Sequence, residues 1–121
     1  MWHFYLGAPL TVYELDPRNG AEKRTVLGAD VLAGQRLQHV VPAGAWFGSF
    51  LTADAGASAS APSASAAGAL VTPPGDSRDY ALVGCTVAPG FDFADFEMAT
   101  RGALLLQFPH AAADITRLTD A

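Results

Sequence analysis

Three histidines, one cysteine and one acidic cluster hold most of the side chains in this sequence that could do chemistry. The histidines lie at positions 3, 39 and 110, and these spacings form no known metal-binding motif. A lone histidine can still hydrogen-bond a ligand or transfer a proton near neutral pH. We therefore consider His3 as a pocket-lining group, against the alternative that it packs in the core or at an interface.

Three carboxylates alternate with three phenylalanines between residues 91 and 97. This segment lacks the glycine and the alternating oxygen ligands of an EF-hand calcium loop. We expect the phenylalanines to pack inward and the carboxylates to face water. The residues concerned are Phe91, Asp92, Phe93, Asp95, Phe96 and Glu97.

Neither Cys85 nor Ser49 has the sequence context of a catalytic nucleophile. Cys85 lies in an apolar stretch with no base nearby, so we expect a buried, unreactive thiol. Ser49 follows Gly48, but the Gly-x-Ser-x-Gly pattern of a nucleophile elbow is absent. No phosphate-binding glycine loop is present either, and we expect no cofactor.

Composition excludes several classes of function. The chain has 121 residues, enough for one domain, and a net charge of -5 with 12 acidic and 7 basic residues. Nucleic acid and anionic membrane surfaces are therefore not expected partners. One cysteine excludes an internal disulfide framework. The sequence shows no signal peptide and no apolar run long enough for a membrane span, which favours a cytoplasmic protein.

Short strands separated by turns, then helices, must position these residues. Residues 10–15 alternate with the period of a strand, and Asp16–Gly20 is a strong turn signal that allows 22–27 to return as the partner strand. Further short strands are predicted near residues 37–41, 46–51 and 80–87. The period then changes to that of two short helices, the first capped by Thr100 and the second after Pro109. This order predicts an all-β antiparallel sandwich or barrel with a small C-terminal helical tail.

We expect one domain in four segments. Strands occupy residues 1–52 and 70–99, and helices occupy 100–121. Between the strands, residues 53–69 are almost entirely alanine, serine and glycine. They have no large side chain to bury, so we expect a flexible surface loop there.

Several segments, in order, resemble the Cupin-5 branch of the cupin superfamily, a domain of unknown function. The resemblance implies a jelly-roll β-barrel with a small-molecule pocket inside it, often as a homodimer. The segments that carry it are Trp2–Leu10, Leu27–Gly28, Gly34–Arg36, Val40–Trp46 and Leu82–Glu97, with parts of the helical tail.

The same resemblance implies that the metal ligands of the general cupin motifs are missing. Gly7 matches the glycine that closes the first motif, which puts the motif's glutamate just before Met1 and its histidines further upstream. We therefore expect the coding sequence, and the barrel, to be incomplete at the N-terminus. In the second motif, Pro42–Gly44 is present, but Phe47 stands in the place of the metal-binding histidine. A phenyl ring cannot ligate a metal, so we expect no metal.

Strand alternation supplies the pocket candidates. It places Trp2 and Phe4 inward and His3 and Tyr5 on the opposite face, unless a bulge intervenes. Parity with the following turn favours Gln38 over His39 as the inward side chain, although both can also lie at the surface. His110 is expected to be solvated or helix-capping. The pocket candidates are Trp2, His3, Phe4, Gln38, Val40, Phe47 and Ser49.

The sequence therefore predicts a cupin-like protein that binds an unidentified small organic molecule without a metal. The alternative is an enzyme similar to the cupin sugar-nucleotide epimerases, which need a base facing an acid across the barrel. A third possibility is a non-functional truncated fragment, which would expose sheet edges and apolar core. Cooperative melting of the soluble chain would exclude the fragment.

Overall fold

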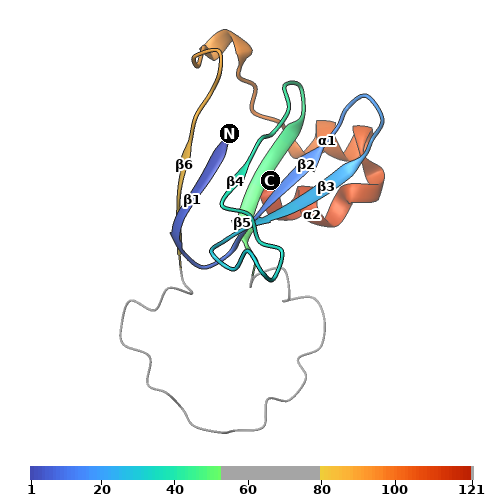
Figure 1. Cartoon of the computed structure of the whole chain (residues 1–121). Helices are drawn as coiled ribbons and strands as arrows, with labels where there is room; N and C mark the ends of the chain where they lie inside the picture. The colour runs from blue at the N-terminus through green and yellow to red at the C-terminus, as the bar shows by residue number, and fades with distance from the viewer. Residues whose placement is uncertain (53–79, 121) are drawn as a thin grey trace, which may run out of the picture.

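Two antiparallel sheets, each of three strands, form the body of the computed structural model, which describes residues 1–52 and 80–120. Figure 1 shows these elements. One sheet has the order β4-β1-β6 and the other β3-β2-β5. The strands are β1 (Trp2–Gly7), β2 (Leu10–Leu15), β3 (Glu22–Leu27), β4 (Gln38–His39), β5 (Trp46–Leu51) and β6 (Ala81–Cys85), and the helices are α1 (Arg101–Gln107) and α2 (Ala112–Leu118).

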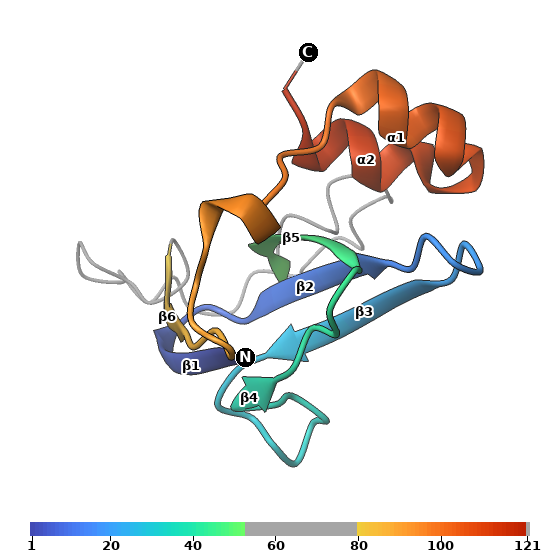
Figure 2. The ribbon, with the colours of Figure 1, turned by 90° about the horizontal axis from the view of Figure 1, so that it is seen from above.

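The elements stack in three layers, with sheet β3-β2-β5 in the middle (Figure 2). The two helices cover one of its faces, and strands β1, β4 and β6 lie on the other side. Strand β2 runs through the centre of this sheet, so all six of its residues are buried. Two hydrophobic cores result, one on each side of β2.

Successive residues of β2 point to opposite faces of the central sheet, so its apolar side chains are shared between the two cores. The core under the helices contains Tyr13, Leu15, Leu104, Phe108, Ala111 and Ile115. The core between the two sheets contains Phe4, Leu10, Val12 and Leu27, with Trp2, Val41, Leu51, Ala81 and Val83 packed against it. This second core faces the candidate site.

Most predicted elements are confirmed. The strands expected at residues 10–15, 22–27 and 46–51 have the same bounds in the structure, while those expected at 37–41 and 80–87 are shorter. Thr100 precedes α1 with an extended backbone, but its side chain makes no capping hydrogen bond. The loop expected at 53–69 lies outside the described residues. In residues 1–52 and 80–120, no helix is long and apolar enough to cross a membrane.

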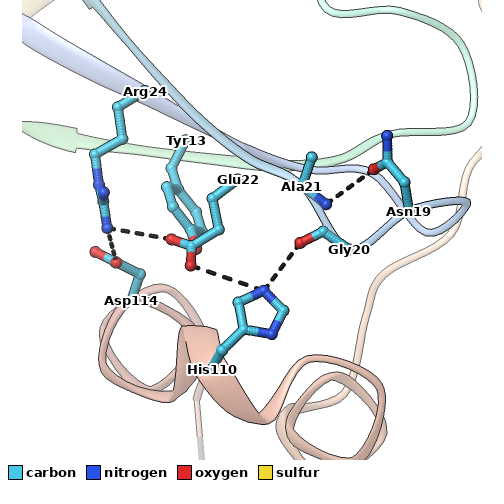
Figure 3. Close-up of polar contacts among 8 residues, drawn as sticks. All are labelled: Tyr13, Asn19, Gly20, Ala21, Glu22, Arg24, His110 and Asp114. Carbon is cyan, nitrogen blue, oxygen red and sulfur yellow. Dashed lines mark hydrogen bonds and ion pairs between the residues drawn. The ribbon is translucent and has the colours of Figure 1, made fainter.

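A polar network fastens the helices to the β2–β3 hairpin (Figure 3). The guanidinium of Arg24 on β3 forms an ion pair with Asp114 on α2 and lies 3.4 Å from Glu22 Oε2. The Tyr13 hydroxyl donates to the same Glu22 oxygen at 2.7 Å. Burial, and then this hydrogen bond, raise the pKa of Tyr13. The ion pairs of this network therefore hold the Arg24 side chain on the helix side of the sheet.

His110 joins the same region from the turn between the helices. Its Nε2 donates to the carbonyl oxygen of Gly20 at 2.9 Å and lies 3.7 Å from Glu22 Oε1 (Figure 3). Its side chain is half exposed. The expected solvation is thus partial, and the imidazole links the helical layer to the hairpin turn.

Two predictions about burial are wrong. Phe91, Phe93 and Phe96 are exposed, because the segment after β6 leaves the end of the sheets on its way to α1 (Figure 1). Their rings pack on one another instead, with centroids 5.0 and 5.7 Å from Phe91. The neighbouring carboxylates face water as expected. Cys85 is exposed rather than buried, since it ends the edge strand β6.

Candidate functional site

The face of the central sheet that looks toward β1 carries charged and hydroxyl groups among its apolar residues. Residues paired across an antiparallel ladder share a face, and Glu14 pairs with Lys23 on β3 and Phe47 on β5. The full inward row is Leu10, Val12 and Glu14 on β2, Lys23, Thr25 and Leu27 on β3, and Phe47, Ser49 and Leu51 on β5.

A buried pair between the sheets, Glu14 and His39, is the centre of the candidate site. His39 Nε2 lies 2.6 Å from Glu14 Oε2, and the two side chains are only 8% and 5% exposed. Lys23 Nζ lies 3.9 Å from the same carboxylate oxygen, so it adds a positive field rather than a hydrogen bond. An imidazole bonded to a carboxylate is suited to hold or pass on a proton.

A cavity of about 570 Å³ opens at the β3 edge beside this pair. Its size falls within the range of roughly 300–1,000 Å³ that small-molecule sites occupy. His39, Lys23 and Thr25 reach it from the inward face, and the loop after β3 closes one side. The lining residues are Lys23, Arg24, Thr25, Val26, Ala33, Gly34, Gln35, Arg36, His39 and Thr52.

A second hollow, of about 430 Å³, lies on the helix side of the sheet. Its walls are mainly apolar and include Trp46, Phe96, Met98 and Leu118. The buried histidine and its carboxylate partner do not line it. We therefore place the candidate site at the β3 edge, where groups capable of proton transfer and of ion pairing converge.

Four predicted pocket residues point toward the space between the sheets. Phe4 and Trp2 belong to the core there, and the Trp2 ring meets the Phe47 ring edge-on at 6.2 Å. Ser49 pairs with Val12 and shares its inward face. The bulge in β1 comes after Phe4, so it does not disturb the predicted alternation. None of these four lines the cavity at the β3 edge.

The predicted orientation of residues 38–40 is wrong. His39 is buried, whereas Gln38 and Val40 are exposed. The reason is the register with β1, in which Trp2 pairs with His39 and His3 with Gln38. His39 therefore shares the inward face of Trp2, where Glu14 satisfies its imidazole.

His3 lies on the outer face and not in the pocket. Its Nε2 is 2.8 Å from Thr86 Oγ1, and its Nδ1 is 3.1 Å from Gln38 Nε2. Both contacts are exposed to solvent. The structure thus fits the alternative of a packed or interface histidine better than a pocket role for His3.

Sequence reasoning missed Glu14, Lys23, Thr25 and Arg36. A signal for Glu14 was present, because it is the only charged residue in the strand 10–15, which is apolar enough to be buried on both faces. A buried carboxylate requires a partner. That partner, His39, is 25 residues away, so only the packing of the two sheets brings the pair together.

Few metal-ligating side chains gather at the site. Within residues 1–52 and 80–120, no three His, Cys, Asp or Glu side chains are grouped closely enough to hold one. Among the buried residues that the structure describes, Glu14 and His39 are the two ligand-type groups, and each is the hydrogen-bond partner of the other. Phe47 occupies the inward position next to Glu14.

Comparison with known proteins identifies the family. Residues 1–99 match the Cupin_5 family, described as Cupin superfamily (DUF985). The chain belongs to the Cupin_5 family. An X-ray structure of a Shewanella oneidensis protein is similar to this cupin, with a TM-score of 0.71 and 32% sequence identity. The match covers 98% of this chain and 60% of that one, so this cupin spans about 60% of that protein's length. No curated protein matches the chain.

The family and the structural neighbour confirm the expected fold class. The two facing antiparallel sheets with short C-terminal helices are consistent with the jelly roll of cupins. In this cupin the space between the two sheets contains the Glu14–His39 pair.

Proposed function

We propose that this cupin binds a small organic molecule, without a metal, in the cavity at the β3 edge, and that His39 and Glu14 anchor it. The observation that carries the proposal is the buried 2.6 Å contact between these two side chains, one of which lines the cavity. We propose binding without a metal because Glu14 and His39, the two buried side chains of the described residues that could ligate one, are hydrogen-bonded to each other.

The stability of the fold gives little reason for such a pair. Burying a carboxylate and an imidazole costs desolvation energy, and apolar residues of the same volume are often as stable or more stable. The pair therefore makes sense as a polar contact for something that enters the cavity. Its place at the wall of the cavity supports this interpretation.

One ring nitrogen of His39 remains open to a ligand. Nε2 contacts Glu14, while Nδ1 makes no hydrogen bond within the described residues. Since no buried side-chain nitrogen or oxygen there lacks a partner, Nδ1 must be reached by solvent. Glu14 orients the ring, so Nδ1 can offer a ligand a fixed donor or acceptor.

A ligand screen tests the proposal. We would screen sugars, small acids and phosphorylated metabolites by thermal shift in chelator-treated buffer, and map each hit by amide NMR. We expect a hit to shift the signals of Lys23, Thr25 and His39. The variant His39→Gln should weaken binding about tenfold, since the imidazole and its hydrogen bond to the ligand are lost.

The control for that screen is His3→Gln, which changes a partly buried histidine on the outer face. It should bind each hit as the unchanged protein does. Equal affinity in His39→Gln and His3→Gln would contradict the proposed anchor. So would hits that map only to the hollow around Trp46.

An epimerase or isomerase is the second candidate, favoured by the same pair. A carboxylate-backed imidazole can take a proton from a sugar carbon and return it. We would incubate the protein with a bound sugar nucleotide in deuterated water and follow exchange at the sugar carbons by NMR. Exchange that is lost in Glu14→Gln supports catalysis. Binding without any exchange would leave the protein a binder.

We further propose that the protein forms a homodimer in the cytoplasm. The outer face of sheet β4-β1-β6 supports the dimer, since it exposes apolar side chains. Analytical ultracentrifugation would test it, with a monomer as the contradicting result. These exposed residues include Tyr5, Leu6, Val40 and Leu82.

A further inference from the structure

We propose that the cavity at the β3 edge selects ligands that carry a phosphate or carboxylate group, and that Lys23 and Arg36 hold this group. The inference deepens the proposed function, because it assigns a ligand class to the same cavity. Three of the chain's seven basic side chains line this one cavity, and its described lining contains no carboxylate. This concentration is notable in a chain whose net charge is -5.

Only two of the three cations are available to a ligand. Arg24 forms its ion pair with Asp114, contacts Glu22, and lies over the Tyr13 ring at 5.0 Å. Its charge is thus balanced on the helix side of the sheet, as Figure 3 shows. Among the residues that the structure describes, Lys23 has only the long 3.9 Å contact to Glu14. It therefore keeps hydrogen-bonding capacity for an anion.

Arg36 is held in place by its backbone while its side chain stays uncompensated. Its amide donates to Val26 O at 2.9 Å, and its carbonyl accepts from Gly28 N at 3.0 Å, which ties it to the end of β3. Within the described residues, its guanidinium has no hydrogen bond or ion pair. Because the backbone is fixed and the guanidinium has no partner in the described part of the chain, its N–H donors are available to bind an anion.

Hydrogen bonds and close packing hold the loop that forms the cavity wall around Arg36. Gln35 Oε1 accepts from Asp30 N at 3.0 Å, which pins the loop across the cavity. The Gln35 side chain lies so close to Gly28 that a Cβ there would stand 2.0 Å from Oε1. A side chain at position 28 would therefore push the Gln35 side chain out of its place in this wall.

The chemistry of the wall suits a negatively charged group at one end of the ligand. An arginine fork binds phosphate or carboxylate through two parallel hydrogen bonds, and a lysine adds a compact charge. Thr25 and His39 line the same cavity, and their side chains can hydrogen-bond the neutral part of the ligand.

The test is an NMR titration of the full chain with sodium pyrophosphate, with sodium succinate and with neutral erythritol at constant ionic strength. We expect at least one anion to shift the amides of Thr25, Gly34, Gln35 and Arg36, and erythritol to do so far less. Added salt should weaken the binding, because screening acts on these partly exposed cations.

Charge-neutral variants locate the binding. Arg36→Gln and Lys23→Gln should each weaken anion binding about tenfold, the effect of losing one charge-assisted contact. The matched control is Arg18→Gln. Arg18 is an exposed arginine paired with Asp16 at the hairpin turn, away from the cavity. It should bind the anions unchanged.

The possible results distinguish phosphorylated ligands from carboxylic acids, and they test the anion site separately from the proposed function. Pyrophosphate binding alone indicates phosphorylated ligands, and succinate binding alone indicates carboxylic acids. Absence of binding by both anions, or equal affinity in Arg36→Gln and Arg18→Gln, overturns the inference. A neutral screening hit that needs His39 would then still support the proposed function. Anion binding that survives His39→Gln supports the anion site and contradicts only the role of His39.

Discussion

A double-mutant cycle on Glu14 and His39 measures how strongly the two sheets are coupled through the candidate site. We would replace each residue by leucine, singly and together, and determine the free energy of unfolding of all four proteins. The two side chains touch at 2.6 Å and are almost fully buried, so solvent screens the contact very little. Each single variant leaves one polar partner buried and alone, whereas the double variant leaves neither.

The structure gives the expected sizes. His39→Leu leaves a buried carboxylate whose remaining cation, Lys23, is 3.9 Å away, and breaking such a pair costs about 3–5 kcal/mol. Glu14→Leu leaves an imidazole that can stay neutral, so about 1–3 kcal/mol is expected. The double variant replaces the pair by apolar groups at little net cost. The coupling free energy should therefore be about 4–8 kcal/mol, since the double variant avoids the costs that the two single variants incur.

Urea unfolding followed by circular dichroism and by tryptophan fluorescence supplies the free energies, provided that the two transitions coincide. The control cycle uses His3 and Gln38, whose 3.1 Å contact is exposed on the outer face. Its coupling should stay below about 0.5 kcal/mol. Additivity of the Glu14 and His39 variants within about 0.5 kcal/mol would refute the pairing on which the site is built.

Three further predictions concern the scaffold. Gly7→Ala should cost about 2 kcal/mol more than Gly34→Ala in urea unfolding, because both have positive φ but only the Gly7 Cβ would lie 2.3 Å from backbone; equal costs would contradict this. Asp114→Asn should destabilise by about 1 kcal/mol, since its partner Arg24 is half exposed, and no change would argue against the network. Burial and a hydrogen bond raise the pKa of Tyr13, so the unfolded chain loses this proton first and stability should fall above about pH 10; an identical fall in Tyr13→Phe would contradict it.

The central sheet was predictable because a strand-forming segment stands on each side of a strong turn signal. Leu10–Leu15 and Glu22–Leu27 flank a turn signal, Asp16–Gly20, and hairpin partners adjacent in sequence pair directly. The orientation of β4 was not predictable. Its two residues are too few to show an alternation, and its register depends on β1, far away in the sequence. That register decides that His39 and not Gln38 faces inward.

The same limit explains the other differences. The alternation of Phe91 and Phe93 indicates a strand face, but the segment has left the sheets and no partner strand covers it within the described residues. Trp2 and Phe4 were placed inward correctly because β1 keeps its alternation as far as Phe4. The cavity itself depends on a loop after β3, which no periodicity describes.

The most direct test of the account is the ¹⁵N chemical shift of the His39 imidazole during titration of the chelator-treated protein with its best ligand. His3 and His110 serve as internal references, since neither lines the cavity. The account predicts a saturable shift of the His39 ring nitrogens while the other two imidazoles stay constant. A ligand that stabilises the protein and leaves the His39 signals unmoved would contradict it.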